Sequence, residues 1–137
     1  MDLIKIEKDC ERARSLFKLS MLRYKKLNNF DISEESSLIA ESYYEICKEL
    51  ITALLFIDGY KTLSHKDLVS YIKENYKNEF DFSEIETLDI LRKRRNKIVY
   101  YGVFVDENYI ERNKKIFESL IKKIKNIIEG KLKWKYL

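Results

Sequence analysis

The chain has 137 residues, which is enough for one domain with a single hydrophobic core and too few for two. Hydrophobic residues make up 45% of it and charged residues 36%, a balance that excludes a disordered chain and predicts a folded domain with a densely charged surface. There is no proline and there are only three glycines, whereas a β-rich fold needs more turn-forming residues, so residues 1–137 are predicted to form one all-α domain.

The first predicted helix runs from about Asp2 to Leu27, because apolar or small residues recur at every third or fourth position. A second helix is predicted from about Ser33 to Asp58. Gly59 follows it, and glycine readily adopts the left-handed conformation that ends many helices. The second half of this helix is apolar on most sides, which predicts that it is the central buried helix.

Capping residues in the sequence predict where the next two helices begin. Ser64, with an aspartate three residues later, is expected to cap a short helix over about His65–Asn75. After a polar loop, Ser83 and Glu86 fit a capping box, which predicts a fourth helix from there to about Tyr100.

The fifth predicted helix begins after Asp106, its expected N-cap, and ends near Gly130. Gly102 is expected to end the fourth helix before it. The remaining residues, 130–137, form a basic tail that contains Trp134 and Tyr136. Five helices with short connections predict an antiparallel helical bundle.

Several functional classes are not supported by the sequence. The longest apolar run, residues 53–57, is far short of the about 20 residues that span a membrane, and no secretion signal is present, so we expect a cytoplasmic protein. Cys10 and Cys47 lie in helical patterns and are expected to be free thiols. One histidine and two distant cysteines cannot complete a zinc site, and three scattered glycines cannot form a phosphate-binding loop. No metal or cofactor is therefore expected.

Charge is distributed unevenly along the chain. Residues 111–137 carry nine Lys/Arg and three Glu, a net charge of +6, whereas residues 1–110 have a net charge of −2. A basic C-terminal segment is typical of proteins that bind an anionic partner such as nucleic acid, but a lysine-rich helix is also an ordinary solvated surface. Two roles are likewise open for Trp134 and Tyr136, which can stack on nucleic acid or pack back onto the bundle.

The most unusual segment is the basic end of the fourth predicted helix, where five cations occur in the six residues from Arg92 to Lys97. Cations at this end of a helix interact favourably with its dipole, which accounts for part of the charge. At about 100° per residue, however, Arg92 and Arg95 lie beside the apolar side marked by Leu88 and Leu91. An arginine next to a buried face needs a partner, which can be a carboxylate, a helix-end carbonyl or a phosphate.

The same segment carries a family resemblance. From Arg95 to Gly102, the sequence Arg-Asn-Lys-Ile-Val-Tyr-Tyr-Gly closely resembles the signature of HEPN domains, in which an Arg, a polar residue that is often Asn, three more residues and a His end the fourth helix. Residues 41–55 resemble the second helix of that family, and residues 59–68 resemble its turn into the third helix. The resemblance covers nearly the whole chain in the right order.

HEPN domains are helical bundles that dimerise so that the Arg and His of both subunits meet in one cleft. Many are metal-independent ribonucleases that act as toxins or antiviral effectors, often paired with a small nucleotidyltransferase antitoxin. The resemblance implies an HEPN-like homodimer that binds RNA, with such a partner, in which Arg95 contacts the scissile phosphate, Asn96 orients it and Tyr100 holds the acid–base position. The neighbouring side chains expected to bind RNA or its phosphates are Arg92, Arg94, Lys97 and Tyr101.

Tyr100 departs from the family pattern, which has His at this position. A His with a pKa of about 6.5 can carry a proton at neutral pH, whereas a Tyr with a pKa of about 10 is a poor general base, although it can donate a proton or stack on a base. Two functions therefore remain open. One is an RNA-binding homodimer with metal-independent endoribonuclease activity of the toxin–antitoxin kind, and the other is a catalytically inactive interaction module in which Arg95 and Asn96 hold structure.

Other side chains also have alternative roles. His65 is expected to cap the third helix or to pack on the surface rather than to replace the motif histidine. Glu41, Glu45 and Glu49 form an i, i+4 line on the second helix, which is expected to be solvated or salt-bridged, with pairing to an arginine of the basic segment as the alternative. Three rings are expected in the core or at a dimer interface rather than stacked on bases: Tyr43, Tyr44 and Tyr101.

Overall fold

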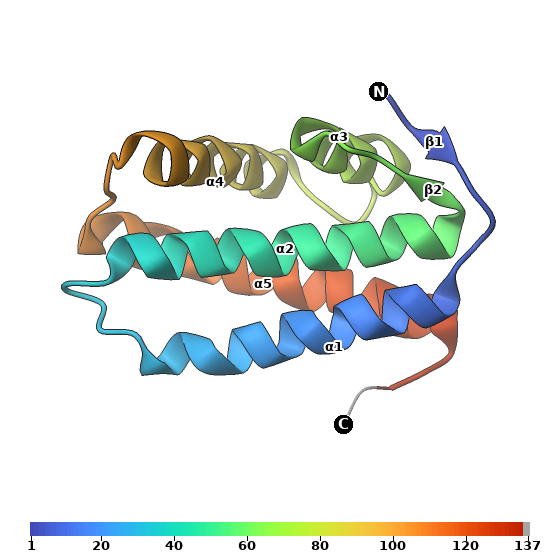
Figure 1. Ribbon diagram of the computed structural model, residues 1–137, viewed down its shortest axis with the longest axis horizontal. Coiled ribbons are helices and arrows are strands. Elements are labelled where there is room, and N and C mark those ends of the chain that lie inside the picture. The colour runs from blue at the N-terminus through green and yellow to red at the C-terminus, as the bar shows by residue number, and fades with distance from the viewer. Residues whose placement is uncertain (136–137) are drawn as a thin grey trace.

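The computed structural model describes residues 1–135 and consists of five α-helices and a small two-stranded antiparallel sheet (Figure 1). The helices are α1 (Cys10–Lys26), α2 (Ser36–Asp58), α3 (His65–Asn75), α4 (Phe82–Tyr101) and α5 (Glu107–Leu132), and a 3-10 turn follows α1 at Leu27–Asn29. The strands are β1 (Ile4–Lys5) and β2 (Tyr60–Lys61). The predicted all-α helical bundle is confirmed. None of the helices in the described part of the chain is both long and apolar enough to span a membrane.

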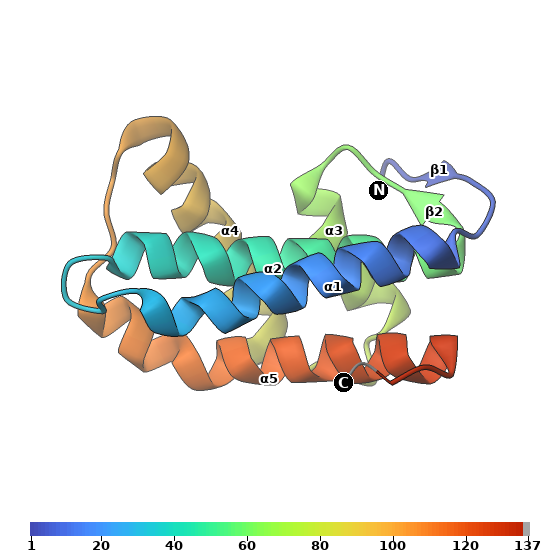
Figure 2. The ribbon, with the colours of Figure 1, turned by 60° about the horizontal axis from the view of Figure 1, so that its bottom comes forward.

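The helix α2 is the centre of the bundle, and it packs against all four other helices. α3 and α4 lie on the other side of α2 from α1 (Figure 1). α1 runs antiparallel to α2, whereas α5 runs in the same direction as α2 because α3 and α4 bring the chain back between them (Figures 1 and 2). The second half of α2 is buried nearly throughout, as its apolar composition predicted, and it contributes Leu50, Ile51, Ala53, Leu54 and Leu55 to the core.

The neighbouring helices complete the core with aromatic and aliphatic side chains. Phe17 of α1 and Phe117 of α5 are fully buried, and Leu88 and Leu91 anchor α4. Cys10 and Cys47 are both free thiols. Complete burial raises the pKa of the Cys47 thiol to about 12, so this cysteine is a core residue without thiolate reactivity.

Most of the expected helix ends are confirmed. Gly59 and Gly102 both adopt the left-handed conformation, with φ of 89° and 64°, and end α2 and α4. The Ser64 side chain accepts a hydrogen bond from the backbone N–H of Asp67 at the start of α3. The Asp106 carboxylate accepts one from the Tyr109 N–H at 2.9 Å and caps α5.

The first helix is shorter than predicted, because it begins at Cys10 and not at Asp2. Asp9 caps it, and its own backbone N–H donates to Phe56 O of α2. Ahead of this cap, residues 4–5 form β1, which pairs with β2 just after α2. The apolar spacing of the first residues therefore reflects packing of an extended segment, and the helical prediction for them was wrong.

Three other predicted boundaries were also wrong. α2 begins at Ser36 instead of about Ser33. The capping box of α4 is formed by Asp81 and Glu84, two residues before the predicted Ser83 and Glu86, and both of its reciprocal hydrogen bonds are present. Gly130 does not end α5, which continues to Leu132. A glycine can occupy an ordinary helical position when the flanking apolar residues are held in the core.

Candidate nucleic-acid interface

The helix α4 presents the basic segment on two different surfaces. Leu88 and Leu91 fix its orientation against α2, so that Arg92 and Arg95 lie partly buried beside them. Arg94 and Lys97 point to the exposed side. The sequence prediction that arginines flank the apolar side of this helix is therefore confirmed.

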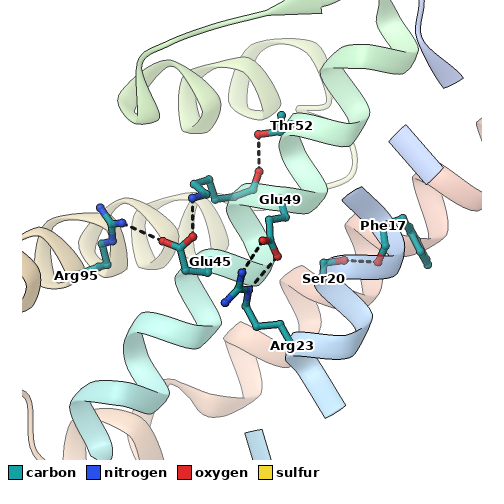
Figure 3. Close-up of polar contacts among 8 residues, drawn as sticks. Phe17, Ser20, Arg23, Glu45, Glu49, Thr52 and Arg95 are labelled. Atoms are coloured by element: carbon teal, nitrogen blue, oxygen red, sulfur yellow. Dashed lines mark hydrogen bonds and ion pairs between the residues drawn. The ribbon is translucent and has the colours of Figure 1, made fainter. Parts of the chain in front are cut away.

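The predicted catalytic arginine, Arg95, is paired with a carboxylate inside the protein. Its Nη2 donates to Glu45 Oε1 at 3.0 Å (Figure 3). Its guanidinium also lies over the Tyr44 ring, at 5.6 Å from the ring centre. Nη1 donates to Asn96 Oδ1 at 3.4 Å, which brings the two predicted site residues together. Only 14% of the Arg95 side chain is exposed. A phosphate at Arg95 would therefore have to compete with Glu45.

Neighbouring positive charges keep the carboxyl group of Glu45 ionised. Burial by itself raises the pKa of this carboxyl, but the hydrogen bond and charge of Lys48 and the charge of Arg95 outweigh it and lower the pKa below its ordinary value. Glu45 is therefore ionised at neutral pH and neutralises Arg95. The alternative role expected for the acidic line of α2, pairing with an arginine of the basic segment, is confirmed at this residue.

A second carboxylate of the acidic line, Glu49, is also paired with an arginine. Glu49, which is buried, forms two hydrogen bonds to the Arg23 guanidinium, at 3.1 and 2.9 Å (Figure 3). The predicted salt-bridged face is thus present on α2. It ties α2 to α1 through Arg23 and to α4 through Arg95.

Arg92 is paired within its own helix. Its Nε donates to Asp89 Oδ1 at 3.0 Å, and Lys93 lies 3.3 Å from the other oxygen of the same carboxylate. Of the residues predicted to contact phosphate, Arg92 is therefore neutralised locally. Lys97 is exposed and forms no ion pair with any residue in the range 1–135.

Tyr100 does not share a surface with Arg95. It follows Arg95 by five positions, which is about 140° round the helix, and 68% of it is exposed. Tyr101 is 79% exposed, and the following loop adds Phe104 at 77%. Tyr43 and Tyr44 are core rings, as expected, whereas Tyr101 does not lie in the core, and its place at a dimer interface stays a prediction. The last turn of α4 and the loop after it thus form an exposed aromatic surface.

The single histidine lies closer to Arg95 than the sequence indicated. The rings of His65 and Tyr44 are 5.9 Å apart, so Tyr44 contacts both His65 and Arg95. Burial lowers the pKa of His65, and the positive charges of Lys48 and Arg95 lower it further. The imidazole is therefore neutral at pH 7. Sequence spacing gave no signal of this proximity, since it arises from the packing of α3 and α4 on α2.

The C-terminal tail packs back onto the bundle. The Trp134 ring meets the Phe17 ring edge-on at 5.3 Å, and the Arg14 guanidinium lies 6.0 Å from the Trp134 ring. Of the two roles left open for this tryptophan, packing is the one observed. Tyr136 lies outside the described residues.

These features divide the predicted site into two parts. Arg95 and Asn96 belong to a partly buried cluster with Glu45 and His65, whereas Lys97 and the exposed aromatic rings form an open surface. Comparison of the chain with protein-family models, curated proteins and solved structures finds no significant match, so the HEPN resemblance rests on the residues themselves.

Proposed function

We propose that the protein is an HEPN-like homodimer that binds single-stranded RNA through the last turn of α4 and the loop that follows it. The observation that carries this proposal is the exposure of Lys97, Tyr100 and Tyr101, which lie on one face of α4 by their helical spacing, with a further exposed ring, Phe104, in the next loop. Lys97 has no ion-pair partner among residues 1–135. Single-stranded RNA is bound by stacking of its bases on aromatic side chains and by cations that follow its phosphates. Buried aromatic rings, such as Tyr44, are not available for this role.

The homodimer is supported by apolar side chains at the same end of α4. Val99 and Val103 are nearly half exposed beside Tyr100, and clustered exposed apolar side chains are typical of interaction sites. Two copies that meet through this end would place two sets of cations in one cleft, as the HEPN resemblance implies. A nucleotidyltransferase partner is part of the same proposal and rests on that resemblance alone.

Ribonuclease activity is a second candidate function, favoured by the neutral His65 beside Arg95. In this case His65 accepts the proton of the RNA 2′-hydroxyl as that oxygen attacks the phosphorus, and Arg95 stabilises the charge of the phosphorane. The P–O5′ bond then breaks, the 5′-oxygen leaves with a proton from water, and a 2′,3′-cyclic phosphate remains. Arg95 would have to exchange Glu45 for the phosphate. Tyr100, by its exposure, would stack on a base instead of moving a proton.

One set of variants tests both functions. Labelled single-stranded RNA is titrated in the presence of EDTA, and both fluorescence anisotropy and RNA length are recorded. Lys97→Ala is expected to weaken binding and to reduce the salt dependence by about one phosphate contact. Tyr101→Ala is expected to cost about 1–3 kcal/mol through lost stacking. Lys77→Ala, an exposed lysine between α3 and α4, serves as the control and is expected to bind as the original protein does.

The cleavage record separates the two functions. Cleavage that is lost in both Arg95→Ala and His65→Ala but kept in Tyr100→Phe supports the ribonuclease with His65 as the proton carrier. Binding of RNA without cleavage supports the RNA-binding homodimer and rejects the ribonuclease activity. If RNA neither binds nor is cut, both functions are rejected.

A further inference from the structure

A small pocket lies where the loop after α4 meets the start of α5. Its volume is about 150 Å³, and its walls are formed by Arg94, Phe104, Val105, Asp106, Tyr109 and Arg112. It is separate from the Arg95–Glu45 cluster, none of whose residues lines it. From the sequence, Arg94 is expected to bind phosphate and Asp106 to cap a helix, and the other four residues carry no expectation.

Two arginines of this pocket are without carboxylate partners. The Arg94 guanidinium lies 5.5 Å from the centre of the Tyr109 ring, and Arg112 Nε donates to the Asn108 carbonyl at 3.3 Å. Neither forms an ion pair with any residue that the structure describes, in contrast to Arg23, Arg92 and Arg95. Two guanidiniums beside one pocket present a concentrated positive charge with donors that match an oxyanion.

The N-terminus of α5 lies at the same pocket, since its N-cap Asp106 is one of the lining residues. In a helix the first backbone N–H groups have no intrahelical acceptor, and they carry the positive end of the helix dipole. The Asp106 cap accepts from the Tyr109 N–H. The N–H groups of Glu107 and Asn108 have no hydrogen-bond acceptor within residues 1–135.

The side chain of Tyr109 supplies an independent indication of a ligand. The residue is only 6% exposed, and its hydroxyl has no hydrogen-bond partner in the described structure. Burial raises the pKa of this tyrosine, while the charges of Arg94 and Arg112 act in the opposite direction, so both guanidiniums are near enough to influence the hydroxyl. A buried hydroxyl without a partner is unfavourable. Because Tyr109 forms part of the pocket wall, a ligand oxygen that reached this hydroxyl would remove the penalty.

We propose that this pocket binds a single phosphate group, with Arg94, Arg112, the Tyr109 hydroxyl and the N–H groups at the start of α5 as donors. At about 30 Å³ per water molecule the pocket has room for roughly five waters, which suits a tetrahedral oxyanion, whereas whole small molecules need about 300 Å³ or more. The group attached to the phosphate would extend past the exposed Phe104 ring into solvent. Asp106 opposes the anion, but the two arginines leave a net positive charge.

This inference deepens the proposed function and rests on it for the source of the phosphate. In that setting the phosphate is a phosphodiester of bound RNA, and Phe104 stacks on the adjacent base. The alternative source is free inorganic phosphate. Both sources present the same oxyanion to the same donors, and the experiment distinguishes them.

The direct test is a titration of the full chain with inorganic phosphate at constant ionic strength. Binding is monitored by NMR, through the backbone amide resonances of Glu107 and Asn108. Saturable shifts of these two amides are expected. Arg94→Gln and Arg112→Gln should each weaken binding roughly tenfold or more, since each removes a charge-assisted hydrogen bond. Lys115→Gln, an exposed lysine on the next turn of α5, is the matched control and should bind phosphate unchanged.

Two further variants separate a ligand site from a purely structural pocket. Asp106→Asn keeps the helix cap and removes the opposing charge, so phosphate should bind more tightly. Tyr109→Phe should weaken phosphate binding. If Tyr109→Phe and both arginine variants bind phosphate as the original protein does, or if no saturable shift appears, the inference is wrong.

A competition with RNA identifies the source. If RNA displaces phosphate from the pocket, the phosphodiester is the ligand. If phosphate binds and RNA does not compete, the pocket serves free phosphate and the RNA interface lies elsewhere. If RNA binds through Lys97 while phosphate leaves Glu107 and Asn108 unshifted, the phosphate pocket is rejected and the proposed function stands.

Discussion

At the scale of single residues, the environment of an arginine decides what it can bind. Arg95 lies at the motif position but is held by Glu45 at 3.0 Å. Arg94, its neighbour in the chain, faces an open pocket and forms no ion pair among the described residues. Arg95 therefore contributes to the fold through its ion pair, whereas the adjacent Arg94 is available to bind a ligand.

His65 yields a prediction about pH, because it is the only histidine of the chain. Its pKa in the folded protein is lowered from 6.5, mainly by burial and then by the charges of Lys48 and Arg95. The unfolded chain therefore binds the proton more readily, and the stability that neutral His65 contributes is present above pH 6.5. It is expected to fall as the pH drops below this value towards the folded-state pKa.

The measurement is urea denaturation in steps from pH 7.5 downwards, for the original protein and for His65→Gln. In the variant, the free energy of unfolding should lack the decrease that begins in the original protein as the pH falls below 6.5. A stability profile of His65→Gln parallel to that of the original protein would contradict the assignment.

At the scale of elements, α4 and α5 carry both parts of the interface, and their ends determine its geometry. Gly102 reverses the chain with a φ of 64°, so that the exposed loop residues and the capped start of α5 follow directly on the basic turn. Gly130, by contrast, lies within α5 at an ordinary helical position. At neither glycine would an added Cβ lie within 4 Å of an atom outside its neighbours and its own helix backbone, so backbone conformation distinguishes the two positions.

These two glycines form a matched pair for mutation. Gly102→Ala is expected to destabilise the protein by about 1–2 kcal/mol, because the left-handed conformation strains a residue with a Cβ. Gly130→Ala is expected to stabilise it by about 0.5–1 kcal/mol through helix propensity. Thermal unfolding of both variants measures the effect, and a change of the same sign in both would show that the backbone argument is wrong.

At the scale of the whole molecule, the candidate site is assembled by the packing of four helices. Tyr44 and Glu45 come from α2, His65 from α3 and Arg95 from α4, while α5 adds Arg112 to the phosphate pocket. A polar cluster around Asp58 connects the helices at the C-terminal end of α2. The Asp58 carboxylate accepts hydrogen bonds from the hydroxyls of Tyr71 at 2.5 Å and Tyr76 at 2.6 Å, and it forms an ion pair with Lys131 at 2.7 Å. This polar cluster joins α2 to α3 and α5.

The homodimer is the prediction that belongs to this scale. Val99→Glu introduces a charge among the exposed apolar side chains at the end of α4. It is expected to convert the proposed dimer to a monomer, because an unpaired charge is costly in an interface. Leu22→Glu changes a similarly exposed residue on α1 and should leave the dimer intact. Light scattering coupled to size exclusion gives the mass of each. A monomeric original protein, or dissociation by both variants, would rule out this interface.

The sequence by itself determined the helical class, the central role of α2 and the main helix ends, because apolar periodicity and glycine or capping residues act through local interactions. Boundaries were missed where tertiary pairing prevailed, as at residues 4–5, which form a strand with the segment after α2. The basic segment and the flanking position of Arg95 were also readable, since they follow from helical geometry. Only the tertiary structure placed Glu45 on Arg95, His65 beside Tyr44, and Arg112 with Tyr109 near Arg94. Each of these groups joins residues of different helices, and the packing of side chains between helices, which no local pattern encodes, decides which of them meet.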